Sequence, residues 1–517
     1  MDSGLAECGL HVKHLPLEGP AGSGNKAAMP RLLPLASAVL LVSACGNTQD
    51  QVFERAEADP VEVVDISAPP PEPQSEWAPA DLVEVDHPEW TRDAVIYEID
   101  IRQFSESGTF EGVREQLPRL RDLGVDILRL APIHPIGEEG RAGTLGSPGS
   151  VRDHRAVNPE FGTDADFRRL VDEAHEEGFH VIVDWVADRT ARDSRLASDH
   201  PDWLAGDGGP GFNREEPDTV RLDYADPDLR EHMADAMDHW VREYGVDGFS
   251  VIGAGNVPID FWERVRPRLE AHRPVFLLAD RDGRDLHRRA FDATLARGWE
   301  DALQAIARDG ADTDVLRRVY GDGASAWPDD ALRVTYTSSR EQDARQGVPG
   351  RRLGNAYEPA AVLQFVGEGM PMIQGGQEAG NTSRPDPNER DPIAWRDHPL
   401  RDLFTRLAAF KSANPTLHNG EWGARMREVG NSLPRHIFTF VRERDGNRVV
   451  GIFNFDERPH GFSFSDNLVE GIYTDFRTGE RNAIVEGEVR RLPAWGWQVL
   501  YQSPEVGTEE SEPAEQP

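Results

Sequence analysis

The feature that most constrains the fold of this chain is a regular alternation that runs from about residue 90 to residue 409. Short apolar runs alternate with stretches in which apolar side chains recur every three or four residues. This alternation predicts βα units around a parallel sheet. The candidate strands are residues 94–101, 127–133, 180–186, 248–254, 275–280, a weak one near 291, 332–338 and 370–375. Because there are eight, we expect an α/β fold in the form of a closed (β/α)₈ TIM barrel at residues 88–412.

Segments with apolar residues at helical spacing separate these strands, and the pattern changes after the last of these segments. The expected helices are residues 111–123, 165–177, 227–244, 260–272, 356–368 and 400–412. Beyond Pro415 the apolar residues recur with period two, as in residues 436–442 and 449–455, with the turn pair Asp445-Gly446 between them. This pattern predicts a C-terminal all-β sandwich domain at residues 413–502.

The two ends of the chain show no pattern of a folded domain. Residues 29–45 combine one arginine, a short apolar run and small residues before Cys45. They resemble a bacterial lipoprotein signal, in which Cys45 would be acylated, and they make Met29 a candidate start. The alternative is a short apolar segment that ends in cysteine by chance. We expect an exported, lipid-anchored protein of the cell envelope, with an acidic, Pro-rich tether at residues 46–87 and an acidic tail at residues 503–517.

The charge balance excludes several classes of partner. The chain has 92 acidic and 56 basic residues and a net charge of -36, which argues against binding nucleic acid or an anionic membrane surface. Its only contact with a membrane would therefore be the lipid anchor. Lysine is scarce and carboxylates are abundant, which favours a halophilic bacterial source, although a GC-rich genome would also explain the arginines. With Cys8 and Cys45 as the only cysteines, no disulfide framework is expected.

Several motifs, in order and at consistent spacing, resemble the α-amylase family, glycoside hydrolase family 13. They are residues 94–104 (AVIYEIDIRQF), 123–126 (LGVD), 131–135 (APIHP), 158–163 (NPEFGT), 247–249 (DGF), 369–378 (GMPMIQGGQE) and 492–496 (LPAWG). The resemblance covers roughly residues 88–502. It implies a short domain B at about residues 189–220, inserted after the third strand.

The resemblance also implies where a catalytic triad would lie. In this family a retaining reaction uses an Asp nucleophile, a Glu general acid and a second Asp that binds the distorted sugar ring. The fourth-strand motif reads GFSVI at residues 248–252, so Ile252 holds the position of the nucleophile and Ser250 that of its neighbouring arginine. Asp280 holds the position of the general acid and Glu341 that of the second Asp. No member of the triad is intact.

The other positions around the sugar have changed as well. Ser339 and Arg340 replace the Asn and His of the seventh-strand motif, and Asp188 and Arg189 replace those of the third-strand motif, where Asp184 survives. Gly149 holds the position of a tyrosine that would stack on the sugar. We interpret these residues as a degenerate sugar pocket. Two permanent cations in such a pocket would need partners, so we expect Arg189 and Arg340 to pair with Asp188, Asp280 or Glu341 and to fill the space of a sugar ring.

These changes leave three hypotheses for the function. The first is a catalytically inactive or impaired relative that binds α-glucan, another carbohydrate or an envelope protein. The second is an active α-glucan hydrolase or transglycosylase that uses Asp280, Glu341 or Asp188. The third is an envelope scaffold without a carbohydrate ligand. No cofactor or metal is expected, because His134, His154 and His175 show no ligand spacing and are interpreted as surface or loop residues, and no calcium-loop pattern is found.

Overall fold

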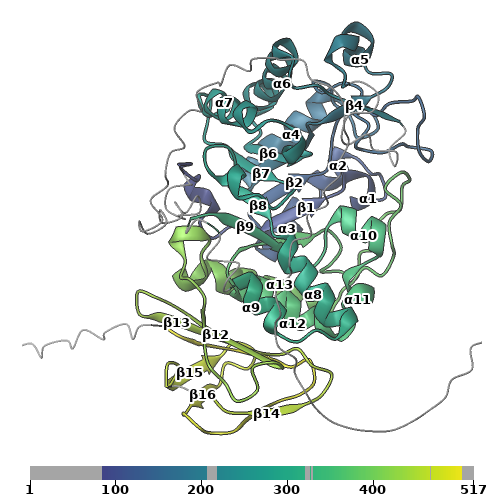
Figure 1. Ribbon diagram of the computed structural model, residues 1–517. Helices are drawn as coiled ribbons and strands as arrows, with labels where there is room; N and C mark the ends of the chain where they lie inside the picture. Colours follow the sequence, from purple (N-terminus) through teal and green to yellow (C-terminus); the bar gives the residue numbers. More distant parts are fainter. Residues whose placement is uncertain (1–83, 206–217, 321–326, 328–329, 466, 504–517) are drawn as a thin grey trace, which may run out of the picture. The chain divides into compact units, whose positions relative to one another are not determined.

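The computed structural model describes residues 84–205, 218–320, 327, 330–465 and 467–503. Within them, eight parallel strands close into a barrel in the order β1-β10-β9-β8-β7-β6-β3-β2 (Figure 1). The strands are β1 (Ile96–Ile99), β2 (Ile127–Leu130), β3 (His180–Val186), β6 (Gly248–Ile252), β7 (Phe276–Ala279), β8 (Ala293–Leu295), β9 (Leu332–Tyr336) and β10 (Met370–Gln374). The barrel predicted from the alternation is therefore present, and the weak run near residue 291 corresponds to β8.

Helices connect and surround these strands. They are α1 (Ile101–Phe104), α2 (Phe110–Arg114), α3 (Leu117–Leu123), α4 (Asp164–Glu176), α6 (Pro227–His239), α7 (Ile259–Glu270), α8 (Arg297–Asp309), α9 (Asp314–Tyr320), α10 (Arg340–Gln346), α11 (Pro349–Arg352), α12 (Tyr357–Val366) and α13 (Pro399–Ala413). The expected helix at residues 111–123 is divided into α2 and α3, because Pro118 is favoured in the first turn of a new helix. Helices α1 and α8 to α11 were not predicted.

The interior of the barrel is built in layers by strand alternation. Its lower layers are apolar, with Ile96, Ile127 and Ile182 on the first three strands. Two residues further along each of these strands the inward side chains are Glu98, Arg129 and Asp184, and all three are buried. The floor of the barrel mouth is therefore charged, whereas the core beneath it is apolar.

A short excursion follows β3 on the way to β6. Strands β4 (Arg189–Ala191) and β5 (Thr219–Arg221) form a two-stranded antiparallel sheet, and helix α5 (Arg195–Asp199) lies between them in the chain. This excursion corresponds to the short domain B expected at residues 189–220. Residues 206–217 of that segment lie outside the described residues.

The C-terminal domain is a six-stranded antiparallel sheet in the order β11-β12-β13-β18-β15-β16, together with the pair β14-β17. Its strands, yellow-green to yellow in Figure 1, are β11 (Arg427–Glu428), β12 (Ile437–Arg444), β13 (Asn447–Asn454), β14 (His460–Phe462), β15 (Gly471–Asp475), β16 (Arg481–Ile484), β17 (Arg490–Leu492) and β18 (Trp497–Gln502). Asp445 and Gly446 join β12 to β13 with φ of 51° and 76°, the left-handed values of a two-residue hairpin turn. The predicted all-β domain and its turn pair are confirmed.

Several sequence predictions fall on segments that the structure does not describe. Cys45 and the signal region lie outside the described residues, as do all but the last residues of the tether and nearly all of the acidic tail. In the part of the chain that is described, no helix is both long and apolar enough to cross a bilayer.

One buried arginine contributes to the contact between the barrel and the C-terminal sheet. Arg442, on β12, is only 1 % exposed, and burial lowers its pKa to about 10. Its guanidinium donates to the carbonyl of Gly367, which follows α12, and to those of Ala424 (2.8 Å) and His418 (3.1 Å). It thus satisfies backbone carbonyls that would otherwise be buried without donors.

We predict that Arg442→Met lowers the free energy of unfolding by about 3 kcal/mol, because several buried carbonyls each lose a hydrogen bond worth about 1 kcal/mol or more. Arg481→Met, at an exposed position on β16, should change it by no more than about 0.5 kcal/mol. Urea unfolding followed by tryptophan fluorescence measures both. Equal effects of the two substitutions would contradict the role given to Arg442.

Candidate active site

A cavity of about 410 Å³ opens at the carboxyl ends of the barrel strands. This is the face on which loops of TIM barrels carry functional groups. Eight of the ten residues that the sequence assigns to the site line this cavity: Gly149, Asp188, Arg189, Ile252, Asp280, Ser339, Arg340 and Glu341. The other two, Asp184 and Ser250, are fully buried residues of β3 and β6. The structure therefore brings residues from widely separated motifs to one place.

The floor of the cavity is an ion-pair network centred on Arg129. Its Nε donates to Oδ1 of Asp184 (2.7 Å), and its Nη2 donates to Oδ2 of the same carboxylate (3.3 Å). Its Nη1 lies 3.1 Å from Oε1 of Glu98. The exposed fractions of the three side chains are 5 %, 0 % and 2 % for Arg129, Asp184 and Glu98. Such a network is stable only if every charge in it is paired.

The protonation of this network follows from its burial. Burial opposes the charge on Arg129, but the carboxylates of Asp184 and Glu98 outweigh it and raise the pKa of Arg129. Burial also raises the pKa of Glu98, although Arg129 acts in the opposite direction. The guanidinium is therefore a permanent cation, and Glu98 is the carboxyl group in the network that is more readily protonated than usual.

Arg129 reaches Asp184 from the opposite side to the one that the family motif implies. Ser250, at the arginine position of the fourth-strand motif, is the register partner of Asp184 on β6. Its hydroxyl is buried and has no hydrogen-bond partner among the described residues. Arg129 lies on β2, the other neighbour of β3. The cation beside Asp184 is thus supplied by β2, and β6 contributes only a small hydroxyl.

Ile252 ends β6 and lines the cavity with a half-buried side chain. Its position is that of the expected nucleophile, but a hydrocarbon side chain cannot attack an anomeric carbon. The covalent intermediate of a retaining glycosidase cannot form at this residue.

Asp280, at the position of the general acid, is held by the backbone. Its Oδ2 accepts a hydrogen bond from the N–H of Gly253 (2.9 Å), and its Oδ1 accepts one from Ala254 (3.3 Å). Burial raises the pKa of Asp280, which these two donors oppose. Gly253 is required at this turn, because its φ is +78° and a Cβ there would lie 2.4 Å from Cγ of Asp188. Both oxygens of Asp280 therefore have partners within the protein.

Asp188 and Arg189 form a pair at the wall of the cavity. Nη1 of Arg189 lies 2.7 Å from Oδ1 of Asp188, and Asn256 donates to the other carboxylate oxygen at 2.7 Å. A Cβ atom on Gly149 would lie 3.1 Å from Nη2 of Arg189, closer than nearly all such contacts. Arg189 thus occupies the space next to Gly149, the position at which the resemblance implies a stacking tyrosine.

Arg340 pairs with a different acid from those expected. Its Nη2 lies 3.8 Å from Oδ2 of Asp184, and its backbone N–H donates to Oε2 of Glu98 (2.8 Å). Glu341 is half exposed and lies 3.2 Å from Arg345 and 3.7 Å from Arg297. The expected pairing of Arg189 with Asp188 is present, whereas the expectation that the two arginines fill the site is wrong. The reason is that Arg340 is drawn down to the buried carboxylates Asp184 and Glu98, which leaves the cavity above it open.

Two histidines interpreted as surface or loop residues are in fact buried. His134 and His154 lie in loops but are 1 % and 4 % exposed, and their rings pack against Trp185. Burial lowers their pKa values to about 3 and about 4. They are uncharged near neutral pH and belong to the packing beneath the loops. His175 is partly exposed, and its Nε2 lies 2.7 Å from Asp247.

The sequence did not identify four residues that form much of the site. Glu98 and Arg129 are charged residues at inward positions of buried strands, and that unusual placement was readable from the strand alternation. Asn256 ends the short 3-10 helix that follows β6, and Arg297 is the first residue of α8, which follows β8; neither belongs to a motif, so no sequence signal marked them.

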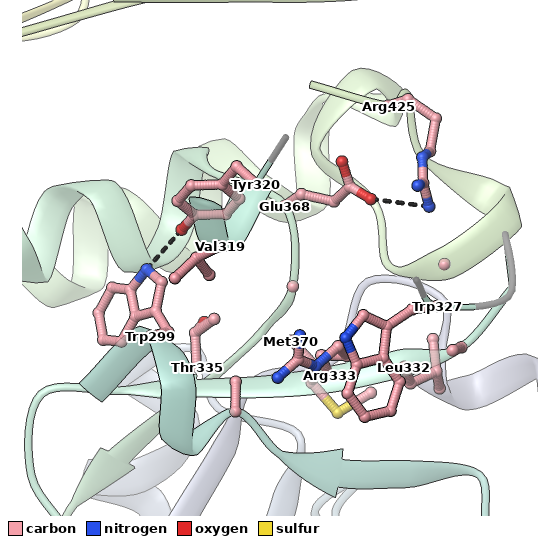
Figure 2. Close-up of a pocket in the computed structure, with 14 residues that line it drawn as sticks. Trp299, Val319, Tyr320, Trp327, Leu332, Arg333, Thr335, Glu368, Met370 and Arg425 are labelled. Atoms are coloured by element: carbon pink, nitrogen blue, oxygen red, sulfur yellow. Dashed lines mark hydrogen bonds and ion pairs between the residues drawn. The ribbon is translucent and has the colours of Figure 1, made fainter. Parts of the chain in front are cut away.

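A second cavity lies at the opposite ends of β9 and β10, near Leu332 and Met370, where these strands begin (Figure 2). Figure 2 shows the indole of Trp299 donating to the hydroxyl of Tyr320 (2.5 Å) and Glu368 paired with Arg425 (2.9 Å). The volume of this second cavity, about 50 Å³, is enough for a few water molecules. We therefore place the candidate site at the larger cavity.

Comparisons with known proteins give consistent results. The family model for the alpha-amylase catalytic domain matches residues 74–202, a span that ends before β6. An alpha-amylase of Haloarcula japonica is 27 % identical over 399 residues, which are 72 % of this chain and 57 % of that enzyme. A maltosyltransferase of Cereibacter sphaeroides, named for α-1,4-glucan and maltose-1-phosphate, is 35 % identical over 197 residues, 34 % of this chain and 33 % of that enzyme.

Solved structures agree over most of the chain. An alpha-amylase from Lactobacillus plantarum superposes with a TM-score of 0.72 and 26 % identity, covering 80 % of this chain and all of that one. A maltogenic alpha-amylase from Thermotoga neapolitana also reaches a TM-score of 0.72, with 23 % identity over 79 % of this chain and 98 % of that one. The barrel and the C-terminal sheet thus match the architecture of these enzymes.

We predict that Arg129→Met lowers the free energy of unfolding by about 3–5 kcal/mol, because Glu98 and Asp184 would remain buried without their cation. Arg121→Met, which removes an exposed arginine paired with Glu177, should cost no more than about 1 kcal/mol. Adding Glu98→Gln to Arg129→Met should recover part of the loss, since one uncompensated charge is removed. Chemical unfolding at pH 7.5 measures the three effects, and equal costs for the two single substitutions would contradict the network.

Proposed function

We propose that the chain, which is similar to enzymes of the α-amylase family, binds α-glucan chains in its barrel-mouth cavity without cleaving them. The observation that carries the proposal is Ile252, which lines an open cavity where the nucleophile of the family would lie. Its relatives are named as enzymes of glucan metabolism, and this chain is a glycoside-hydrolase-like protein of the same kind. The loss of turnover and the binding role are our proposal.

The contacts of the remaining carboxylates support the absence of turnover. Retaining hydrolysis needs one free carboxylate to attack and one carboxylic acid to protonate the leaving oxygen. Asp280 accepts hydrogen bonds on both oxygens, and Asp188 is occupied by Arg189 and Asn256. Glu341 is paired with Arg345 at the rim. Each acid that could replace the triad therefore already has a partner within the protein.

The cavity wall supports binding of a ligand rich in hydroxyl groups. Its volume of about 410 Å³ is in the range of small-molecule sites. Guanidinium groups such as that of Arg297 and hydroxyls such as that of Ser339 offer donors, and the carboxylate of Glu341 offers acceptors. The described lining residues include no aromatic side chain. We therefore expect recognition through hydrogen bonds, with lower affinity than a site with a stacking platform.

Two alternatives remain as outcomes of the test. An active enzyme would use Asp280, Glu341 or Asp188, and a scaffold of the envelope would bind a protein partner and no glucan. Turnover that disappears in Asp280→Asn would establish the first. If the chain shows no turnover and no glucan binding but captures an envelope protein, the second alternative is established.

We predict that the chain binds maltoheptaose measurably by calorimetry in concentrated salt and releases no reducing sugar from it. The Ile252→Asp variant should be equally inactive, because Asp280 is one methylene shorter than the glutamate expected as general acid and the aromatic at residue 149 would still be missing. Cellohexaose serves as the control ligand and should bind at least about tenfold more weakly. Reducing-sugar release by the unmodified chain would overturn the proposal.

The location of binding can be tested on α10. Ala344 lines the cavity, whereas Gln346 lies on the same helix, is exposed and does not line it. We expect Ala344→Trp to fill the opening and weaken maltoheptaose binding at least about tenfold, and Gln346→Trp to leave it unchanged. Equal affinities in the two variants would place the glucan elsewhere.

We further propose that the protein acts at the cell envelope and is anchored by a lipid on Cys45. The proposal rests on the signal-like residues 29–45. We predict that Cys45→Ala moves the protein from the membrane fraction to the soluble fraction, whereas Cys8→Ala leaves fractionation unchanged. Immunoblots of separated fractions measure this, and membrane association of the Cys45→Ala protein would refute the anchor.

A further inference from the structure

The C-terminal domain holds a cluster of three potential metal ligands far from the barrel mouth. His436 immediately precedes β12, Asp456 follows β13, and His460 is the first residue of β14. Strands β12 and β13 belong to the six-stranded sheet, and β14 belongs to the two-stranded sheet. The cluster therefore lies where the two sheets of the domain meet.

The ligand atoms converge on one point. Nδ1 of His436 lies 2.6 Å and Nε2 of His460 lies 3.1 Å from the same oxygen, Oδ2 of Asp456. All three atoms lie within 4.8 Å of one another, and this is the one such group of three among the described residues. Tetrahedral zinc with bonds of about 2.0–2.1 Å places its ligand atoms about 3.3 Å apart. Small side-chain rotations are enough to reach that spacing.

One ring nitrogen of the cluster is buried without a well-directed hydrogen bond. Nε2 of His460 is inaccessible to solvent, yet it has no hydrogen-bond partner among the described residues, although Oδ2 of Asp456 is near. The two imidazole rings are stacked with centroids 4.7 Å apart. This buried ring nitrogen is therefore available as a ligand for a cation placed between the imidazoles and the carboxylate.

The carboxylate of Asp456 is held in place by its second oxygen. Oδ1 of Asp456 accepts a hydrogen bond from the backbone N–H of Arg458 (2.9 Å), which leaves Oδ2 directed at the imidazoles. Asn454 stabilises the same turn by donating to the carbonyl of Arg458 (2.8 Å). Outer hydrogen bonds of this kind orient the ligands of metal sites.

We propose that His436, Asp456 and His460 bind a divalent transition-metal ion of the Zn²⁺ type. Two imidazoles and one carboxylate suit such ions, whereas Ca²⁺ and Mg²⁺ prefer oxygen ligands alone. The side chain of His436 is 44 % exposed, so water completes the coordination from the open side. The bound ion ties the start of β12 to the start of β14 and stabilises the packing of the two sheets.

The test is calorimetric titration of the metal-stripped full chain with ZnCl₂ at pH 7.5. We expect one equivalent of Zn²⁺ to bind at this cluster. His436→Ala and His460→Ala should each weaken that binding at least about 100-fold, because loss of a ligand exceeds the 10–100-fold effect of losing an outer hydrogen bond. If the alanine variants do not fold, His436→Gln, which changes the most exposed of the three ligands, takes their place in the titration.

A matched control comes from the barrel. His175 and His180 also flank one aspartate, but they approach different oxygens of Asp247, at 2.7 Å and 3.7 Å. We expect His175→Ala to bind Zn²⁺ as the unmodified chain does, and Ca²⁺ to give no competition. Zn²⁺ should raise the unfolding temperature of the unmodified chain and of His175→Ala, but not of His460→Ala. The absence of stoichiometric Zn²⁺ binding, or equal affinity in His460→Ala and His175→Ala, would overturn the proposal.

Discussion

The guanidinium group of Arg129 lies inside the barrel, and the groups at the mouth are arranged around its charge. A cation at this depth requires carboxylates within hydrogen-bond distance, and Asp184 and Glu98 satisfy that requirement from the two strands beside β2. The same two carboxylates also hold Arg340: Asp184 lies near its guanidinium group, and Glu98 accepts a hydrogen bond from its backbone N–H. The first residue of α10 is thus fixed by a network that begins on β2. The shape of the cavity depends on this chain of pairings.

The sequence predicted the fold well where local patterns are long, and less well where they are short. The hairpin around Asp445 and Gly446 follows from turn chemistry alone. Strand β8 has only three residues, too few to show alternation, and so gave a weak signal. Helix α8 could have been predicted, because Trp299, Ala302, Leu303 and Ile306 have helical spacing and are buried.

The sequence predicted which residues lie at the site, but it did not predict which of their charged side chains pair with one another. Motif order was enough to place Ile252, Asp280 and Arg340 at one barrel mouth, since the carboxyl ends of parallel strands meet there. Which acid each arginine contacts depends on strand register and on side-chain reach, which single-sequence patterns do not contain. Arg340 was therefore assigned to rim carboxylates, whereas it lies beside the buried pair Glu98 and Asp184. The inward position of Arg129 was readable from the strand alternation, but its partners, 31 and 55 residues away, could not be assigned from the sequence.

The position of Arg129 also has a consequence for any attempt to redesign the barrel mouth. Ser250 is the register neighbour of Asp184 on the side opposite to Arg129, so an arginine at residue 250 would place a further guanidinium group beside the same carboxylate. Removing Arg129 alone would instead leave Glu98 and Asp184 buried without the cation that lies between them. The two positions are therefore coupled, and an arginine can be moved from β2 to β6 only by changing both residues together.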